Sequence, residues 1–442
     1  MLKNRISKWT QSEDSLVRVF RNSSWLFSAK GIGAILSIFY LALLTRSLGV
    51  SGFGEFMMIV SAVQLLAAIL KLQTWQAVVR FGAPYLLTGD DRAFRKLSIR
   101  SFLIELSGGI LACGALWLLL PVGGTHFGWS HSMALAIMGY GAVVFLSVRS
   151  TAIGILRAQD RFGGNAAGDA IIPLVRFTGA ILLFFATPTI AGFLVVWALS
   201  EFISFLFMWF LVARNRKVIA QPASSQLPVT APSWPEFFSF LFFTNLAFLA
   251  NVIRERLVVV IVGIFVGPTA AGLYRLADQL ANSVNRLAEV FARPLFAELS
   301  KLFAGNESDR LTGLFWRSLR VSAVSGAVMF LALVLLGQFM IDVISGPEFL
   351  AAYPILLLLG AATIISLSGL GLEPLLQAAN RAHVALIAKL AGLTALAMAM
   401  TLLLPKYGTM GVSWAMLLSA IITTILLFLF SRSAIAKPHP AA

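Results

Sequence analysis

Charged and amide side chains recur at helical spacing in an apolar stretch near residue 280. Successive members are three or four residues apart, which places them on one face of an α-helix; they are Arg275, Asp278, Asn282, Arg286, Glu289 and Arg293. Arginine donates several N–H groups to phosphate oxygens, and a dry surrounding strengthens that attraction. The stripe therefore indicates a surface for an anionic ligand such as a diphosphate. The alternative is structural, because Arg275 with Asp278 and Arg286 with Glu289 are (i, i+3) pairs that can hold the fold without a ligand.

Further charged residues interrupt other apolar segments. The candidate ligand-binding residues are Lys30, Lys71, Arg254, Arg256, Arg275, Asn282 and Arg286. The candidates for coupling to a proton or sodium gradient are Glu255, Asp278 and Glu289. A charge at the centre of a membrane span costs about 2.5–3.5 kcal/mol, so such side chains are expected to face water or a partner charge. No binding role is assigned to the remaining charges of these segments, which include Arg149, Arg176, Lys389, Glu55, Glu105, Asp169, Glu201 and Glu373.

The composition is that of a membrane protein. Of 442 residues, 59% are hydrophobic and 12% are charged, whereas soluble domains carry about 25% charged residues. This excludes an ordinary globular enzyme. The four histidines show no ligand spacing, so we expect neither a metal site nor a cofactor. The net charge of +15 would suggest nucleic acid in a soluble protein, but basic residues gather in the cytoplasmic loops of membrane proteins.

The apolar runs predict an all-α membrane protein of about twelve spans. A span needs about 20 largely apolar residues. The runs lie at 24–45, 53–79, 101–121, 131–155, 166–187, 190–213, 236–264, 270–297, 319–341, 350–377, 382–404 and 409–431. They are long and continuous and lack the alternation of transmembrane strands.

The distribution of basic residues orients these spans. Most of the 34 Lys and Arg residues fall in the N-terminal segment, in the loops that follow the even-numbered spans, and in the C-terminal tail. The opposite loops contain only Arg46 and Lys406. Because basic loops stay in the cytoplasm, both termini are expected to be cytoplasmic.

The two halves of the chain resemble each other at matching places. Gly49–Gly54 matches Gly267–Gly272, Ile155–Arg161 matches Leu375–Arg381, and Trp197 with Ala198 matches Trp414 with Ala415. Each match is offset by about 220 residues, which indicates a duplication. Six spans per half make the repeats parallel, and transporters built this way place the substrate between two lobes.

The resulting domain prediction has five parts. Residues 1–23 form a cytoplasmic N-terminal segment, and 24–213 form an N-lobe of six spans. Residues 214–235, with four prolines and a basic cluster, form a cytoplasmic linker. Residues 236–431 form a C-lobe of six spans, and 432–442 form a cytoplasmic tail.

Three segments, residues 43–66, 155–177 and 266–287, resemble a known family. Most of the match lies in Arg46, Leu48, Gly49, Gly54 and Phe56 after the first span, and in Gly272, Tyr274 and Ala277 at the start of the eighth. These patterns are similar to those of the repeat-unit flippases of polysaccharide biosynthesis, within the multidrug/oligosaccharidyl-lipid/polysaccharide exporter superfamily. The resemblance implies two six-helix lobes around a central cavity.

The resemblance also implies a function: translocation of an undecaprenyl-diphosphate-linked oligosaccharide from the inner to the outer leaflet of the inner membrane. This translocation would serve O-antigen or exopolysaccharide synthesis, with a polysaccharide polymerase and export machinery as partners. The resemblance implies neither catalysis nor nucleic-acid binding. By span, the basic lumen residues of the family would correspond to Lys30, Arg254, Arg256, Arg275 and Arg286.

Two alternatives remain. A multidrug or cation antiporter of the same fold should have an acidic or aromatic lumen, whereas these spans are net basic. A membrane glycosyltransferase or polysaccharide polymerase needs a catalytic constellation, and the short outer loops show none.

Overall fold

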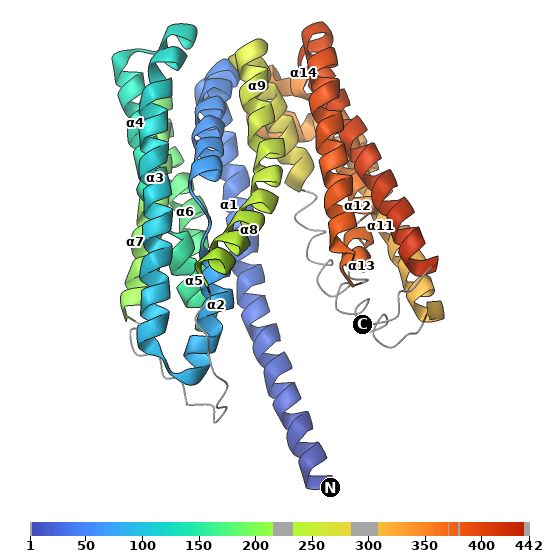
Figure 1. Cartoon of the computed structure of the whole chain (residues 1–442). Coiled ribbons are helices and arrows are strands. Elements are labelled where there is room, and N and C mark those ends of the chain that lie inside the picture. The colour runs from blue at the N-terminus through green and yellow to red at the C-terminus, as the bar shows by residue number, and fades with distance from the viewer. Residues whose placement is uncertain (1, 215–232, 284–307, 370, 379–380, 437–442) are drawn as a thin grey trace. The chain divides into compact units, whose positions relative to one another are not determined.

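The structure is a computed structural model that describes residues 2–214, 233–283, 308–369, 371–378 and 381–436 (Figure 1). Side chains are described from residue 33 onwards, apart from positions 34, 247 and 251 and short stretches beside the gaps. Every element in these ranges is helical, which confirms the all-α prediction for the part of the chain that the structure describes.

Nearly continuous helices make up the first half of the chain. They are α1 (Leu2–Leu70), α2 (Trp75–Thr88), α3 (Asp91–Phe127), α4 (His131–Leu146), α5 (Ser150–Ala158), α6 (Phe162–Phe185) and α7 (Ile190–Arg214). Within α1, Gly49 has φ 66° and ψ −178°, so the helix is kinked there. This backbone conformation is favourable for glycine because glycine lacks a Cβ.

The second half begins with α8 (Trp234–Val252), a π-helical turn (Ile253–Leu257) and α9 (Val258–Phe265). Residues 268–283 are also helical. The remaining elements are α11 (Ser308–Ser345), a 3₁₀ segment (Pro347–Ala352), α12 (Tyr353–Ser368), α13 (Leu372–Ala378) and α14 (Ala382–Ala436). Gly408, with φ 54°, kinks α14.

Eight helical stretches of the described residues are long and apolar enough to cross a membrane. They are Ile35–Leu70, Asp91–Phe127, His131–Ala158, Phe162–Phe185, Ile190–Arg214, Leu319–Ser345, Pro347–Ser368 and His383–Ser433. The last of them contains the kink at Gly408. These stretches agree with the prediction of a multi-pass helical membrane protein, while the number of twelve spans stays a prediction.

Several expected spans are not continuous α-helices. Non-helical residues 71–74 interrupt the expected span 53–79, and residues 147–149 interrupt 131–155. The π-helical turn lies within 236–264, and a turn at Gly369 interrupts 350–377. An average of hydropathy over a span does not detect such breaks, because the residues around them remain apolar.

The chain folds into two compact units. The first comprises Met1–Leu48 and Ile59–Leu257, and the second comprises Gly49–Met58 and Val258–Ala442. In the first unit, α2, α3 and α8 share a core in which Phe81 packs on Phe237 and Phe240, with ring centroids 5.7 and 5.5 Å apart. In the second unit, α13 and α14 form a core of Leu372, Leu375, Leu376, Ala385, Ala388 and Leu427.

Two glycines allow the helix that follows Gly49 to approach the helix 268–283 closely within the second unit. A Cβ on Gly54 would collide with the carbonyl oxygen of Pro268, and a Cβ on Gly272 would lie 2.5 Å from the carbonyl oxygen of Val50. Small residues let membrane helices pack backbone to backbone. Both glycines belong to the matching glycine motifs of the two halves, so the motifs themselves form this contact.

We predict that Gly54→Ala lowers the free energy of unfolding by about 1–3 kcal/mol, because the added methyl group overpacks a backbone contact. The midpoint of thermal unfolding in detergent micelles measures the effect. Gly114→Ala in α3 is the matched control, since no atom lies within 4 Å of its Cβ position. Equal midpoints for Gly54→Ala and the wild type would show that the two helices are farther apart.

Candidate functional site

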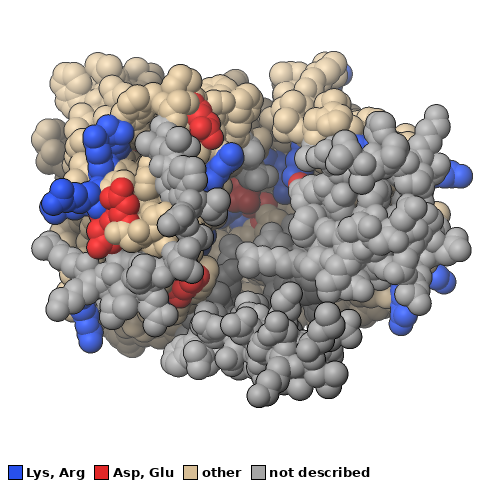
Figure 2. All heavy atoms as spheres, turned by 60° about the horizontal axis from the view of Figure 1, so that its bottom comes forward, with Lys and Arg blue, Asp and Glu red and all other residues tan. Residues whose placement is uncertain are grey.

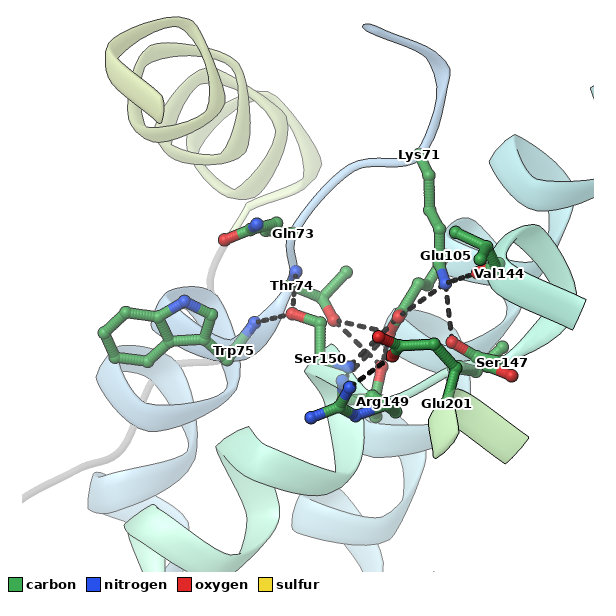
Figure 3. A network of polar contacts seen from close by, with 12 residues as sticks. Lys71, Gln73, Thr74, Trp75, Glu105, Val144, Ser147, Arg149, Ser150 and Glu201 are labelled. Carbon is green, nitrogen blue, oxygen red and sulfur yellow. Dashed lines mark hydrogen bonds and ion pairs between the residues drawn. The ribbon is translucent and has the colours of Figure 1, made fainter. Parts of the chain in front are cut away.

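Two interrupted helices meet inside the first unit. The chain leaves helical geometry at residues 71–74, between α1 and α2, and at residues 147–149, between α4 and α5. A break in a membrane helix exposes backbone N–H and C=O groups that lipid cannot satisfy. Buried side chains of neighbouring helices supply the missing hydrogen bonds, and these side chains form the candidate site (Figure 3).

Glu105 of α3 caps the start of α5. Its carboxylate accepts from the backbone N–H of Ser150 at 3.0 Å and of Thr151 at 2.9 Å. It also accepts from the hydroxyl groups of Thr151 at 3.0 Å and Thr74 at 3.4 Å. Glu105 is 1% exposed. A negative charge at the N-terminus of a helix is favourable, so the buried Glu105 carboxylate stabilises the start of α5.

Lys71 stabilises the other side of the same break. Its ammonium group donates to the carbonyl oxygens of Val144 at 3.2 Å and Ser147 at 2.5 Å, at the end of α4. It lies 3.6 Å from a carboxylate oxygen of Glu105. An ammonium group has three donors, and these three contacts engage them. Lys71 and Glu105 thus hold the two ends of the interrupted helix together.

Two polar side chains complete the hydrogen bonds of the break between α1 and α2. The Ser150 hydroxyl oxygen accepts from the backbone N–H groups of Thr74 at 2.9 Å and Trp75 at 3.0 Å. The Asn245 side chain of α8 accepts from the N–H of Gln73 at 2.6 Å and donates to its carbonyl oxygen at 3.3 Å. The break is therefore defined by side chains from several helices.

An ion-pair chain extends from the break to α6 and α7. Arg149 precedes α5 and contacts Glu201 of α7 at 2.6 Å and Asp169 of α6 at 3.3 Å. Arg176 of α6 contacts the other carboxylate oxygen of Glu201 at 3.0 Å and lies over the Trp197 ring at 4.7 Å. Basic and acidic side chains thus alternate, and Figure 2 likewise shows acidic atoms directly beside basic atoms on the face in view.

Most of this site was not assigned by the sequence. Glu105, Arg149, Asp169, Arg176 and Glu201 stand out in the sequence as charges in apolar segments, but none received a role. The signal that indicates them is the complementary sign of charges on consecutive spans. Among the predicted binding residues whose side chains the structure describes, Lys71 lies in this network.

The π-helical turn carries three predicted site residues. Arg254 and Glu255 are exposed, and Arg256 is half-buried. Arg256 lies near enough to Tyr140 of α4 to act on it electrostatically, as Arg176 and Glu201 also do. Single π turns in membrane and soluble helices are frequent at functional sites.

In the second unit, the predicted stripe begins as a set of internal contacts. Arg275 contacts Asp278 at 2.6 Å, and the Asn282 amide donates to Asp278 at 2.7 Å. The Arg275–Asp278 pair is the (i, i+3) ion pair of the structural alternative. Lys30 belongs to α1 with its side chain outside the described atoms, and Arg286 and Glu289 lie outside the described residues.

Another ion pair of the second unit joins α13 and α14, where Lys389 contacts Glu373 at 2.7 Å. In the described part of the chain, no group of three or more His, Cys, Asp and Glu side chains is placed to hold a metal ion.

Comparison with known proteins shows the family of the chain and a similar inner membrane protein. Residues 19–302 match the model of a family described as "Polysaccharide biosynthesis protein". The chain is 27% identical over 340 residues to the inner membrane protein YghQ of Escherichia coli K12, covering 76% of this chain and 95% of YghQ. With the eight candidate spans, this match indicates a multi-pass protein of the inner membrane.

Solved structures share the fold. An inward-facing multidrug resistance MATE family transporter of the MOP superfamily has a TM-score of 0.72 and 14% identity, over 93% of this chain and 98% of that chain. The lipid II flippase MurJ in an inward closed conformation has a TM-score of 0.69 and 16% identity, over 92% of this chain and 87% of that chain. These names describe transporters and a flippase, and the similarity at 14% and 16% identity shows a shared fold.

We predict that Glu105→Ala lowers the free energy of unfolding by about 3–5 kcal/mol, because it leaves Lys71 as a buried charge without its ionic partner. Glu105→Gln should cost less, since the amide oxygen still accepts one backbone hydrogen bond. Thermal unfolding in detergent measures both variants. Glu236→Ala, at an exposed position of α8, is the control and should leave the midpoint unchanged. A wild-type midpoint for Glu105→Ala would contradict the capping role.

Proposed function

Because the chain belongs to the polysaccharide biosynthesis protein family and has the fold of MOP-superfamily transporters, we propose that it is a lipid-linked oligosaccharide flippase. It moves an undecaprenyl-diphosphate-linked oligosaccharide from the inner to the outer leaflet of the inner membrane. The product feeds O-antigen or exopolysaccharide synthesis through a polysaccharide polymerase and export machinery.

The observation that carries this proposal is the convergence of ionised side chains inside membrane-spanning helices. Lys71, Glu105, Arg149, Arg176 and Glu201 come from several helices and meet at two helix breaks. Transporters place charged substrate groups at such interrupted helices near the middle of the membrane. A protein that only had to be stable in lipid would not keep so many buried charges, because each is costly.

The proposed architecture has twelve spans in two parallel lobes, residues 24–213 and 236–431, with the linker 214–235 and both termini in the cytoplasm. The lobes alternate between inward-open and outward-open states around a cationic lumen. Carrier binding drives the change only through a difference in affinity between the two states.

The proposed lumen combines the predicted residues with the charges at the helix breaks. The diphosphate is bound by Lys30, Arg254, Arg256 and Arg286. Arg275 also binds it after release from Asp278, and Asn282 binds either the diphosphate or the first sugar. Lys71 is fully engaged by Val144, Ser147 and Glu105, so its contribution is the positive potential it supplies. Glu255, Asp278 and Glu289 are the proposed groups for ion coupling.

The alternative function is that of an antiporter, because the chain shares its fold with a multidrug transporter. An antiporter would transport an organic cation. A polysaccharide polymerase or glycosyltransferase, the other alternative, would form polymer from sugar donors.

The proposed function predicts flipping by the purified protein in liposomes. An undecaprenyl-diphosphate-linked oligosaccharide with a fluorescent sugar should become accessible to a membrane-impermeant quencher from both sides. Replacing the exposed Arg254 and the neighbouring Arg256 by Gln should reduce the rate about tenfold or more, since a charge-assisted hydrogen bond contributes about 1.5–3 kcal/mol.

The double variant Arg317→Gln/Arg320→Gln, at two exposed positions of α11, is the matched control for loss of two positive charges and should flip at the wild-type rate. Absence of flipping by the wild type, together with uptake of an organic cation by the same liposomes, would replace the flippase by the antiporter. Polymer formation from sugar donors would replace it by the polymerase or glycosyltransferase.

The proposed topology predicts that reporters at both termini are cytoplasmic. A green fluorescent protein fused after Ala442 should fluoresce, and alkaline phosphatase fused at the same place should be inactive, because it folds only outside the cytoplasm. Fusions in the loop around Lys406 should show the opposite pattern. An active phosphatase at the C-terminus would contradict its cytoplasmic location.

A further inference from the structure

Arg149 occupies a distinctive place in the first unit. It is the last residue of the break between α4 and α5, and its side chain extends to α6 and α7. Glu105 already accepts the backbone N–H groups at the start of α5. The Arg149 side chain is therefore not needed to cap α5 and can contact a group on its accessible side.

The two carboxylates on Arg149 differ. Glu201 lies 2.6 Å away with a side chain 18% exposed, and it also holds Arg176 at 3.0 Å. Asp169 lies 3.3 Å away with a side chain 53% exposed. Glu201 is thus a short, enclosed contact shared by two arginines, whereas Asp169 is a longer contact that is open on one side. Only the Asp169 contact can be exchanged without disturbing Arg176.

The guanidinium of Arg149 also has unused capacity. Its Nε is buried and has no hydrogen-bond partner, although the two terminal nitrogens are engaged by Glu201 and Asp169. An arginine that binds a phosphate commonly presents two parallel N–H groups to two oxygens. A single carboxylate oxygen at 3.3 Å does not fill this arrangement, and a phosphate group offers the additional oxygens.

We infer that Arg149 is a phosphate-binding residue of the first unit and that Asp169 is its built-in competitor. This inference rests on the proposed function and identifies one subsite for the diphosphate of the carrier. In the empty protein Asp169 contacts Arg149; when a phosphate oxygen arrives, it takes the place of the Asp169 carboxylate, and Glu201 stays on both arginines. Between transport cycles Asp169 supplies an acceptor for the terminal nitrogen of Arg149 that Glu201 does not contact.

The proposed exchange predicts the direction in which the affinity for phosphate changes when Asp169 is replaced. A competitor that holds Arg149 for most of the time reduces the apparent affinity for phosphate by the fraction of time in which Arg149 is available. Removing the competitor must therefore tighten binding. A purely structural ion pair behaves oppositely, since its loss destabilises the site and weakens or leaves unchanged any binding.

The test is titration of the full-length protein in detergent with farnesyl diphosphate, a short polyprenyl diphosphate, by isothermal calorimetry. Asp169→Asn should lower the Kd about 3- to 10-fold, and Arg149→Gln should raise it about tenfold or more. Asp169→Glu retains the competing charge and should stay within about twofold of the wild type. Asp169→Ser and Arg149→Lys serve if the first variants do not fold; Asp169→Ser should tighten binding and Arg149→Lys should weaken it.

Arg80→Gln is the matched control, because Arg80 belongs to the same unit but lies over the Phe240 ring at 4.6 Å, away from this ion-pair chain; its Kd should equal that of the wild type. Farnesol and phosphatidylglycerol distinguish the diphosphate from the chain and from an ordinary anionic headgroup. An unchanged or higher Kd for folded Asp169→Asn overturns the inference, as does a wild type that does not bind farnesyl diphosphate.

The same measurements separate this inference from the proposed function. Wild-type flipping in liposomes with no effect of the Asp169 and Arg149 variants on affinity would reject the subsite and keep the flippase. Tight binding with the predicted changes but no flipping would reject the flippase and keep the phosphate subsite.

Discussion

The hydrogen bonds of interrupted helices are the constraint on which the first unit depends. A helix that stops inside a membrane leaves several N–H and C=O groups without partners, and hydrocarbon offers none. Here the partners are side chains: Glu105 for the N–H groups of α5, Lys71 for the carbonyl groups of α4, and Asn245 for the residue Gln73. The ion pair between Lys71 and Glu105 follows from this arrangement, because each charge stands where the helix dipole favours it.

This constraint also explains why Arg149 is positioned so firmly. Glu105 accepts from the backbone N–H of Ser150, and Lys71 donates to the carbonyl oxygen of Ser147. The backbone on both sides of Arg149 is therefore held in place, and from there its side chain reaches α6 and α7. A cationic group that must recognise an anion repeatedly benefits from such preorganisation, since little ordering is needed on binding. The enclosed carboxylate of Glu201 then limits the local excess of positive charge.

The sequence predicts the class of fold well, because apolar length and loop charge are local properties. The helical character of the chain and its crossing of the membrane follow from that pattern, and the glycines at Gly54 and Gly272 are recognisable as close-contact residues. The breaks at Lys71 and Arg149 are not predictable in this way. No proline or glycine marks them, and they exist because residues distant in the chain, such as Glu105 and Asn245, supply the hydrogen bonds.

The candidate site shows the same division. Helical spacing correctly brings Arg275, Asp278 and Asn282 into contact, since they belong to one helix. It does not reveal which charges on different helices meet. The contacts of Arg149 with Glu201 and Asp169 are therefore not predictable from the sequence. The parts of the stripe at Arg286 and Glu289 lie outside the described residues and stay predictions.

The π-helical turn at Ile253–Leu257 has a consequence for the phase of the surrounding helix. Phe237, Leu241 and Asn245 are buried four residues apart in α8, as the α-helical repeat requires. Val258 and Val262, also four residues apart, are buried in α9 but belong to the other compact unit. Because the intervening turn holds more residues than an α-helical turn, the repeat cannot be counted through it. The buried positions of α8 and those of α9 therefore follow two separate four-residue repeats, each of which belongs to the core of its own unit.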